Sequence, residues 1–196
     1  MDSRKTGRPG WVIWFVGLPG AGKSTYAQAV HKVLSERGED ICYLSIDEWR
    51  RVHVPEPRYS RQERIQVYKL FAEEAVRISG QGKNVIMDGT APELSMREYA
   101  RGLIERFAEI YVRCLLETAM RRETNRPQGL VMADLYRKAI KRKQTGEYFN
   151  GLGDVIGVDI PFEENPAAEC IIDSENTSVE QGRNLVLDFL TLWQSG

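Results

Sequence analysis

A glycine-rich segment near the N-terminus constrains the fold of this chain more than any other feature. Residues 17–24 read Gly-Leu-Pro-Gly-Ala-Gly-Lys-Ser, the spacing of a phosphate-binding loop, between an apolar run and a helical pattern. In that setting the backbone N–H groups and the helix N-terminus bind phosphate oxygens, Lys23 reaches the β- and γ-phosphates, and Ser24 can ligate Mg²⁺. The alternative, a glycine-rich turn with a chance lysine, leaves the flanking strand and helix unexplained. The segment therefore predicts that ATP is bound by Gly17, Leu18, Pro19, Gly20, Ala21, Gly22, Lys23, Ser24 and Thr25.

Length and charge indicate one globular domain over residues 1–196. The chain carries 27 Lys and Arg against 28 Asp and Glu, and this balance argues against a dedicated nucleic-acid-binding protein. No apolar run approaches the roughly 20 residues of a membrane helix. The cysteines at 42, 114 and 170 are widely spaced and lie in or beside apolar runs, which favours buried thiols in a reducing compartment. We therefore expect a cytoplasmic protein with no membrane partner.

Short apolar runs alternate with longer helical patterns along the chain. Five runs predict strands, at 11–16, 41–46, 84–88, 109–114 and 169–173. Six patterns predict helices, at 24–37, 60–79, 95–106, 116–123, 130–144 and 178–193. Ser95 with Glu98, and Thr177 with Glu180, predict the capped starts of two of these helices. The alternation indicates an α/β fold with helices on both faces of a parallel sheet.

Two carboxylates come at the ends of predicted strands. Asp47 ends the second strand and Asp88 the third, so both are expected at the sheet edge where open α/β folds bind ligands. Asp88 follows an apolar strand as a Walker B residue does, so Ser24 and Asp88 are the predicted Mg²⁺ ligands. Asp47 and Arg50 fall on one face of a helical turn, where Asp47 could accept a proton from a hydroxyl and Arg50 could bind an anionic group. The simpler alternatives are a helix N-cap for Asp47 and a turn before Gly89 for Asp88.

Basic residues gather over 121–143, within a region of about 121–165 that we expect to act as a lid. Cations on a closing lid stabilise the charge of a moving phosphoryl group and exclude water. We expect Arg122 and Arg126 to bind ATP, and Arg122 to join Lys23, Asp47 and Arg50 in catalysis. Over residues 138–143 a solvated helix face is the favoured interpretation.

Several stretches resemble the adenylylsulfate (APS) kinases, P-loop kinases that phosphorylate the 3′-hydroxyl of adenylylsulfate. The similarity runs from about Trp14 to Leu190. Its segments are WFVGLPGAGKST, the pair Asp47 and Arg50, Leu70-Phe71, YV…LE…RR…LYRKA, and IPFEENPAAECIIDSENTSVEQ. The resemblance implies a three-layer P-loop NTPase fold with strand order 2-3-1-4-5, Mg²⁺ with ATP as phosphoryl donor, and a homodimer.

The departures from that family fall on the acceptor side. An Asp-Gly-Asp-Asn stretch reads Ser45-Ile-Asp-Glu, an Ile-Ser-Pro reads Thr90-Ala-Pro, and the Lys-Gly-Leu-Tyr of the lid reads Ala133-Asp-Leu-Tyr after an insertion. The family's base-stacking phenylalanine corresponds to Val155, and we expect Tyr148 or Phe149 to supply an aromatic ring instead. The expected acceptor-binding residues are Asp47, Arg50, Thr90, Pro92 and Phe149.

The leading functional prediction is ATP-dependent phosphorylation of adenylylsulfate. Asp88 together with Asp47 and Arg50 also resembles the polynucleotide-kinase-like group, so a kinase of another small-molecule or polynucleotide hydroxyl is the alternative. A non-catalytic ATP-binding switch is a third possibility. The carboxylates and the basic lid argue against it, because a switch needs no acceptor base.

Overall fold

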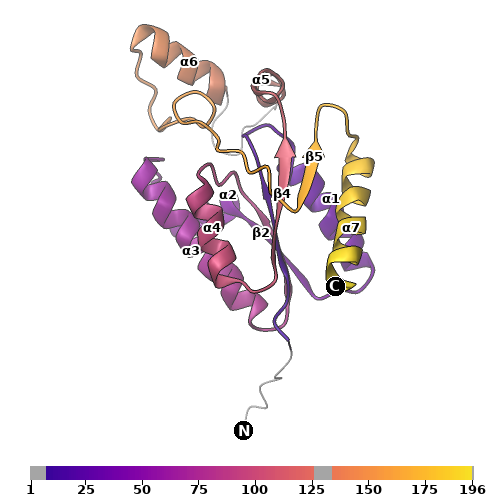
Figure 1. The fold of residues 1–196 in the computed structure, drawn as a ribbon. Helices are drawn as coiled ribbons and strands as arrows, with labels where there is room; N and C mark the ends of the chain where they lie inside the picture. Colours follow the sequence, from indigo (N-terminus) through magenta and orange to yellow (C-terminus); the bar gives the residue numbers. More distant parts are fainter. Residues whose placement is uncertain (1–7, 126–133, 196) are drawn as a thin grey trace.

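A five-stranded parallel sheet forms the centre of the molecule (Figure 1). The computed structural model describes residues 8–125 and 134–195. The strand order is β2-β3-β1-β4-β5, which confirms the predicted order 2-3-1-4-5. The strands are β1 (Val12–Val16), β2 (Ile41–Ser45), β3 (Asn84–Asp88), β4 (Phe107–Arg113) and β5 (Cys170–Asp173).

Helices cover both faces of the sheet and make three layers (Figure 1). One face packs against α1 (Lys23–Glu36) and α7 (Val179–Ser195), the other against α3 (Arg61–Ser79) and α4 (Leu94–Leu103). The remaining helices are α2 (Ile46–His53), α5 (Leu116–Thr124) and α6 (Leu135–Thr145). Figure 1 shows α5 and α6 beyond the carboxyl ends of the strands. Among the described helices, none is long and apolar enough to span a bilayer.

The central strand β1 joins the two halves of the core. Val12, Trp14 and Val16 pack into the cluster under α3 and α4, whereas Ile13 and Phe15 pack into the cluster under α1 and α7. All five side chains are fully buried. A parallel strand covered on both faces is apolar at every position, which explains why the run before the glycine-rich loop shows no polar alternation.

Some predicted boundaries were wrong where tertiary contacts set them. The second strand ends at Ser45, whose hydroxyl accepts from the Glu48 N–H and starts α2, a helix that the sequence indicated only as a turn. Helix α4 ends at Leu103 and β4 begins at Phe107, because Phe107 pairs with Val12 and is buried. Helix α6 begins at Leu135, and the first predicted residues of this helix, 130–133, lie outside the described residues.

The two predicted helix caps were also wrong. The first N–H of α4, that of Leu94, donates to the Glu163 carboxylate at 2.6 Å, so a distant side chain replaces the local Ser95–Glu98 pair. At α7 the exchange of hydrogen bonds joins Ser178 and Gln181, one residue later than predicted. A cap depends on the direction in which the chain enters the helix, and the preceding loop sets that direction.

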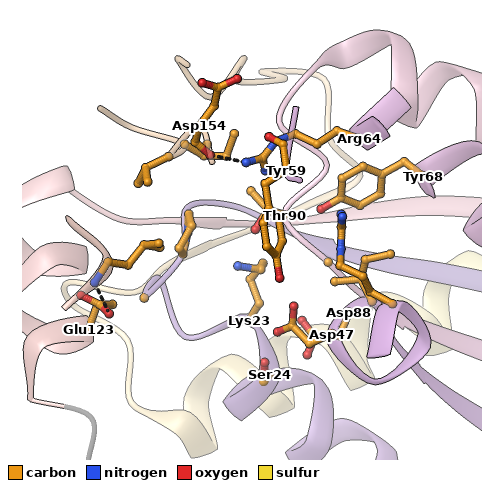
Figure 2. A pocket seen from close by; sticks show the side chains of 18 of the residues that line it. Lys23, Ser24, Asp47, Tyr59, Arg64, Tyr68, Asp88, Thr90, Glu123 and Asp154 are labelled. Carbon is orange, nitrogen blue, oxygen red and sulfur yellow. Dashed lines mark hydrogen bonds between the residues drawn. The ribbon is translucent and has the colours of Figure 1, made fainter. Parts of the chain in front are cut away.

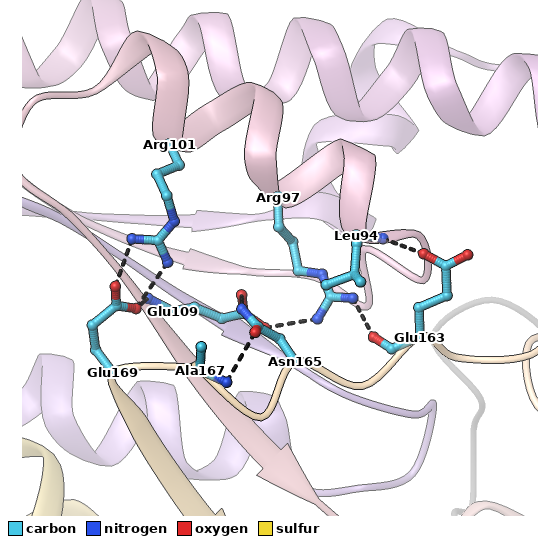
Figure 3. A network of polar contacts seen from close by, with 8 residues as sticks. All are labelled: Leu94, Arg97, Arg101, Glu109, Glu163, Asn165, Ala167 and Glu169. Atoms are coloured by element: carbon cyan, nitrogen blue, oxygen red, sulfur yellow. Dashed lines mark hydrogen bonds and ion pairs between the residues drawn. The ribbon is translucent and has the colours of Figure 1, made fainter.

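A buried ion pair anchors the long irregular segment, residues 146–169, that lies between α6 and β5. Arg97 of α4 pairs with Glu109 of β4 at 2.7 Å, and both side chains are almost fully buried (Figure 3). Arg97 also donates to the Glu163 carbonyl oxygen, and Glu109 accepts from the Asn165 amide at 2.8 Å. The Glu163 N–H donates to the Pro92 carbonyl oxygen. These bonds fix the end of the irregular segment against α4 and β4.

Candidate active site

The glycine-rich loop connects β1 to α1 in the conformation that its sequence predicts. Gly22 has φ +102° as the N-cap of α1, and Gly20 has φ +82°. A Cβ atom on Gly20 would lie 2.3 Å from the Ala119 carbonyl oxygen, so only glycine fits there. The Lys23 ammonium donates to the Leu18 carbonyl oxygen at 2.9 Å, which folds the lysine over its own loop.

A cavity opens above this loop at the carboxyl edge of the sheet (Figure 2). Four regions far apart in the sequence line it: the loop itself, the chain from α2 into α3, the end of β3, and the region from α5 to the irregular segment. The lining residues are Pro19, Gly20, Lys23, Ser24, Ile46, Asp47, Arg50, Tyr59, Arg64, Tyr68, Asp88, Gly89, Thr90, Glu123, Leu135, Leu152, Asp154, Val155 and Ile156.

The polar floor of the cavity holds Lys23, Ser24, Asp47 and Asp88, and Figure 2 shows these side chains close together. Asp88 is buried beside β1, where it pairs in register with Phe15. A hydroxyl and a carboxylate are the hard oxygen donors that Mg²⁺ prefers. Within the described part of the chain, no group of three or more His, Cys, Asp or Glu side chains could hold an ion. The floor fits Mg²⁺ nevertheless, because this ion keeps several waters and binds through one or two protein oxygens and substrate phosphates.

One wall of the cavity combines aromatic rings with arginines. The guanidinium of Arg50 lies 4.8 Å from the centroid of the Tyr59 ring, and that of Arg64 lies 5.7 Å from it. Arg50 is buried and paired with Glu63 at 2.7 Å. Burial raises the pKa of the Tyr59 and Tyr68 hydroxyls and lowers that of Arg64. This wall offers a π-face together with fixed positive charge, which suits an aromatic, anionic ligand.

The opposite side of the cavity comes from the expected lid region. Glu123 accepts from the Leu135 N–H at 3.0 Å, and the Tyr136 hydroxyl donates to the Pro19 carbonyl oxygen at 2.8 Å. Arg64 donates to the Asp154 carbonyl oxygen, so α3 is joined to the irregular segment across the cavity (Figure 2). The described part of this expected lid region thus contacts both the glycine-rich loop and the wall that carries the aromatic rings.

Several predicted site residues lie elsewhere. Arg122 does not line the cavity: its guanidinium donates to the Ser174 carbonyl oxygen at 2.8 Å and to the Ala21 carbonyl oxygen at 3.3 Å. Pro92 is buried two residues after Thr90, and Phe149 packs beside α6 outside the lining. Their parts in binding stay predictions. Arg126 lies outside the described residues.

Five further polar or aromatic residues line the cavity although no sequence motif pointed to them: Tyr59, Arg64, Tyr68, Glu123 and Asp154. A partial signal was present, because Arg64 and Tyr68 are four residues apart in a predicted helix and share one face. Tyr59 has φ +53°, and two N–H groups, its own and that of Arg58, donate to Glu63. No local pattern predicts that loop conformation.

A glycine-rich loop joins the central strand to α1, and two carboxylates lie above it: Asp88 at the end of β3, and Asp47 in the first turn of α2 rather than at the end of β2 as predicted. This arrangement defines a P-loop phosphotransferase. The family model for adenylylsulphate kinase matches residues 9–173, and the chain belongs to this family.

Three similar proteins of known name are kinases. The probable adenylyl-sulfate kinase of Archaeoglobus fulgidus is 35% identical over 165 residues, which cover 84% of this chain and 96% of the relative. The cytidine diphosphoramidate kinase of Campylobacter jejuni is 28% identical, over 93% of this chain and 97% of the relative. The structure of the Mycobacterium tuberculosis APS kinase in complex with AMPPNP and APS superposes with a TM-score of 0.77 at 22% identity, covering 94% of this chain and 99% of that one. This last likeness supports the fold.

Proposed function

We propose that the protein transfers the γ-phosphoryl group of ATP to the 3′-hydroxyl of adenylylsulfate. The observation that carries this proposal is the meeting of Lys23, Asp47 and Asp88 on the cavity floor with Arg50 and Tyr59 on its wall. The floor suits a triphosphate and an acceptor hydroxyl. The wall suits an adenine ring and an anionic phosphosulfate.

The residues divide the reaction between them. Asp47 accepts the proton of the acceptor hydroxyl while the oxygen of that hydroxyl forms the new bond to the γ-phosphorus. The bond between the γ-phosphorus and the oxygen that bridges it to the β-phosphate breaks, and ADP leaves. Lys23 stabilises the negative charge on the transferred group. Bound Mg²⁺ would supply charge neutralisation between the phosphates, and Ser24 and Asp88 are the residues that would hold it. Arg50 binds the acceptor's anionic group, in a position fixed by Glu63.

The placement of Arg122 supports a role in ATP binding rather than in phosphoryl transfer. Its bonds to Ala21 and Ser174 join the glycine-rich loop to the chain after β5. We propose that this link holds the loop in its phosphate-binding form. The region 121–165 serves as the lid over the cavity, in which Tyr136 ties α6 to Pro19.

We also propose that the protein is cytoplasmic and that it forms a homodimer. The three thiols are free, which fits a protein of the reducing cytoplasm. Cys170 is buried whereas Cys42 and Cys114 are half-buried, so the prediction of three buried thiols holds fully only for Cys170. A homodimer remains our proposal for the assembly, and light scattering after size-exclusion chromatography measures it.

Transfer of ³²P from [γ-³²P]ATP tests the function. The wild-type protein should label adenylylsulfate, and Asp47→Asn should lower the rate by about 10²-fold with ATP affinity little changed, because a general base contributes a factor of this order. Asp188→Asn is the matched control, since Asp188 is an exposed aspartate on α7. A cytidine nucleotide and a 5′-hydroxyl oligonucleotide complete the acceptor panel. Transfer to one of these and not to adenylylsulfate would refute the proposed acceptor.

A further inference from the structure

The side chain of Tyr43 lies beside Asp88 on the neighbouring strand. Strands β2 and β3 run parallel with Tyr43 opposite Ile86 and Ser45 opposite Asp88. The Tyr43 hydroxyl donates to Oδ2 of Asp88 at 2.7 Å.

Helix α1 holds Tyr43 from the other side. The Tyr43 ring lies 5.6 Å from the ring of His31, a residue of the helix whose first turn contains Ser24. Tyr43 therefore connects the helix that carries one predicted Mg²⁺ ligand to the strand that carries the other.

Ser45, the residue opposite Asp88, is engaged elsewhere. Its hydroxyl accepts from the Glu48 N–H as the N-cap of α2, and Ser45 does not line the cavity. Strand β2 consequently contacts the Asp88 carboxylate through Tyr43, two residues earlier on the same face of the sheet.

We propose that Tyr43 is a positioning residue for the magnesium site. Its hydroxyl holds one oxygen of Asp88 so that the other oxygen faces the cavity beside Ser24. This inference rests on the proposed role of Asp88 as a metal ligand. A carboxylate with one oxygen fixed by a donor loses the rotational freedom that would otherwise oppose ion binding. Hydrogen-bond partners of this kind commonly change metal affinity by about 10- to 100-fold.

The test measures Mg²⁺-dependent binding of a fluorescent ATP analogue, mant-ATP, with no acceptor present. Tyr43→Phe keeps the ring and removes the hydroxyl, and it should raise the Mg²⁺ concentration for half-maximal binding by about tenfold. Tyr99→Phe is the matched control, because the Tyr99 hydroxyl donates to the Glu73 carboxylate at 2.8 Å outside the cavity. Its Mg²⁺ titration should match that of the wild type.

A double mutant separates positioning from general damage. If Tyr43 acts through Asp88, Tyr43→Phe combined with Asp88→Asn should have the same Mg²⁺ requirement as Asp88→Asn alone. Additive effects would overturn the positioning role. A shift in Asp88→Asn with none in Tyr43→Phe would overturn this inference and leave the metal role of Asp88 intact. An unchanged Mg²⁺ requirement in both single mutants would overturn the inference and also the metal role of Asp88. The proposed function is tested separately, by phosphoryl transfer to adenylylsulfate.

Discussion

At the scale of single residues, the cavity wall that we propose binds the acceptor contains a tyrosine whose backbone adopts an unusual conformation. Tyr59 has φ +53°, in the left-handed region that non-glycine residues rarely occupy. Glu63 stabilises this conformation, since its carboxylate accepts from the N–H groups of Arg58 and Tyr59 and also pairs with Arg50. Such strain collects at functional sites where surrounding contacts hold it. Here it presents the ring to the cavity.

We expect Tyr59→Leu to raise KM for adenylylsulfate by about tenfold and leave KM for ATP unchanged. The physical reason is the loss of an aromatic face, worth roughly 1 to 3 kcal/mol for a stacked base. Steady-state kinetics on both substrates measures the effect, and Phe149→Leu is the companion variant. An increase in KM with Phe149→Leu but not with Tyr59→Leu would show that the loop beside α6 supplies the ring, as the sequence alone suggested.

At the scale of elements, a buried ion pair joins α4 to β4 and to the irregular segment. Arg97 and Glu109 are 2% and 1% exposed, so neither charge is solvated by water. Arg97 donates to the Glu163 carbonyl oxygen, and Glu109 accepts from Asn165. A buried charge that loses its partner keeps the cost of desolvation without the compensating attraction. The pair therefore makes the positions of three separate segments depend on one another.

Arg97→Met should lower the free energy of unfolding by about 3 to 5 kcal/mol, because it leaves Glu109 buried and uncompensated. Arg97→Met combined with Glu109→Leu should recover most of that loss. Urea denaturation measures all variants. Arg101→Met is the control, since its pair with Glu169 is partly solvated and worth about 1 kcal/mol or less. A double mutant as unstable as Arg97→Met alone would contradict this account.

The pair of Arg101 with Glu169 predicts a pH-dependent contribution to stability. Burial would raise the pKa of Glu169, but hydrogen bonds from the Arg101 guanidinium and the Glu109 N–H outweigh it and hold this pKa below its ordinary 4.5. A carboxyl with a lowered folded-state pKa stabilises the protein above its unfolded pKa and loses that contribution as pH falls through the folded value.

Glu169→Gln should therefore reduce the free energy of unfolding by about 1 kcal/mol at pH 7, because the pair is partly solvated. The difference from wild type should shrink as pH falls below 4.5. Urea unfolding at several pH values measures this trend, with Glu98→Gln on the exposed side of α4 as the control. A difference that grows on acidification would contradict the assigned direction of the pKa shift.

At the scale of the whole molecule, the cavity is formed between regions that lie far apart along the chain. The Tyr136 hydroxyl donates to the Pro19 carbonyl oxygen, and Arg64 donates to the Asp154 carbonyl oxygen, so the proposed lid region contacts both the glycine-rich loop and α3. A ligand in the cavity would therefore touch four separate regions of the chain between residues 19 and 156. Ligand binding and global folding should be coupled as in a single domain.

Thermal unfolding should show one cooperative transition that moves upward with Mg²⁺ and AMPPNP. At a ligand concentration of 100 times Kd the added stability is about 2.7 kcal/mol. For a domain of this size that corresponds to an increase in Tm of roughly 5 to 10 °C. Scanning calorimetry measures the shift, and Lys23→Ala is the control that should lose most of it. Two transitions, of which only one responds to the nucleotide, would contradict a single domain over 1–196.

Local sequence determined the glycine-rich loop and the strand and helix that flank it. The β1–loop–α1 unit follows from an apolar run, glycines at positions of positive φ, and a helical pattern, and each of these acts over a few residues. The carboxyl ends of parallel strands meet at one edge, so the sequence pattern was enough to place Asp47 and Asp88 there.

Only the tertiary structure brought together the other residues that line the cavity. Tyr59, Glu123 and Asp154 come together because loops and the lid region cross the sheet edge, and their spacing in the sequence carries no information about that approach. Arg122, which the sequence placed at the reacting phosphate, donates to the carbonyl oxygens of Ala21 and Ser174 and does not line the cavity. Periodicity and turn chemistry depend on neighbours along the chain, whereas a cavity depends on distances between elements, and packing sets those distances.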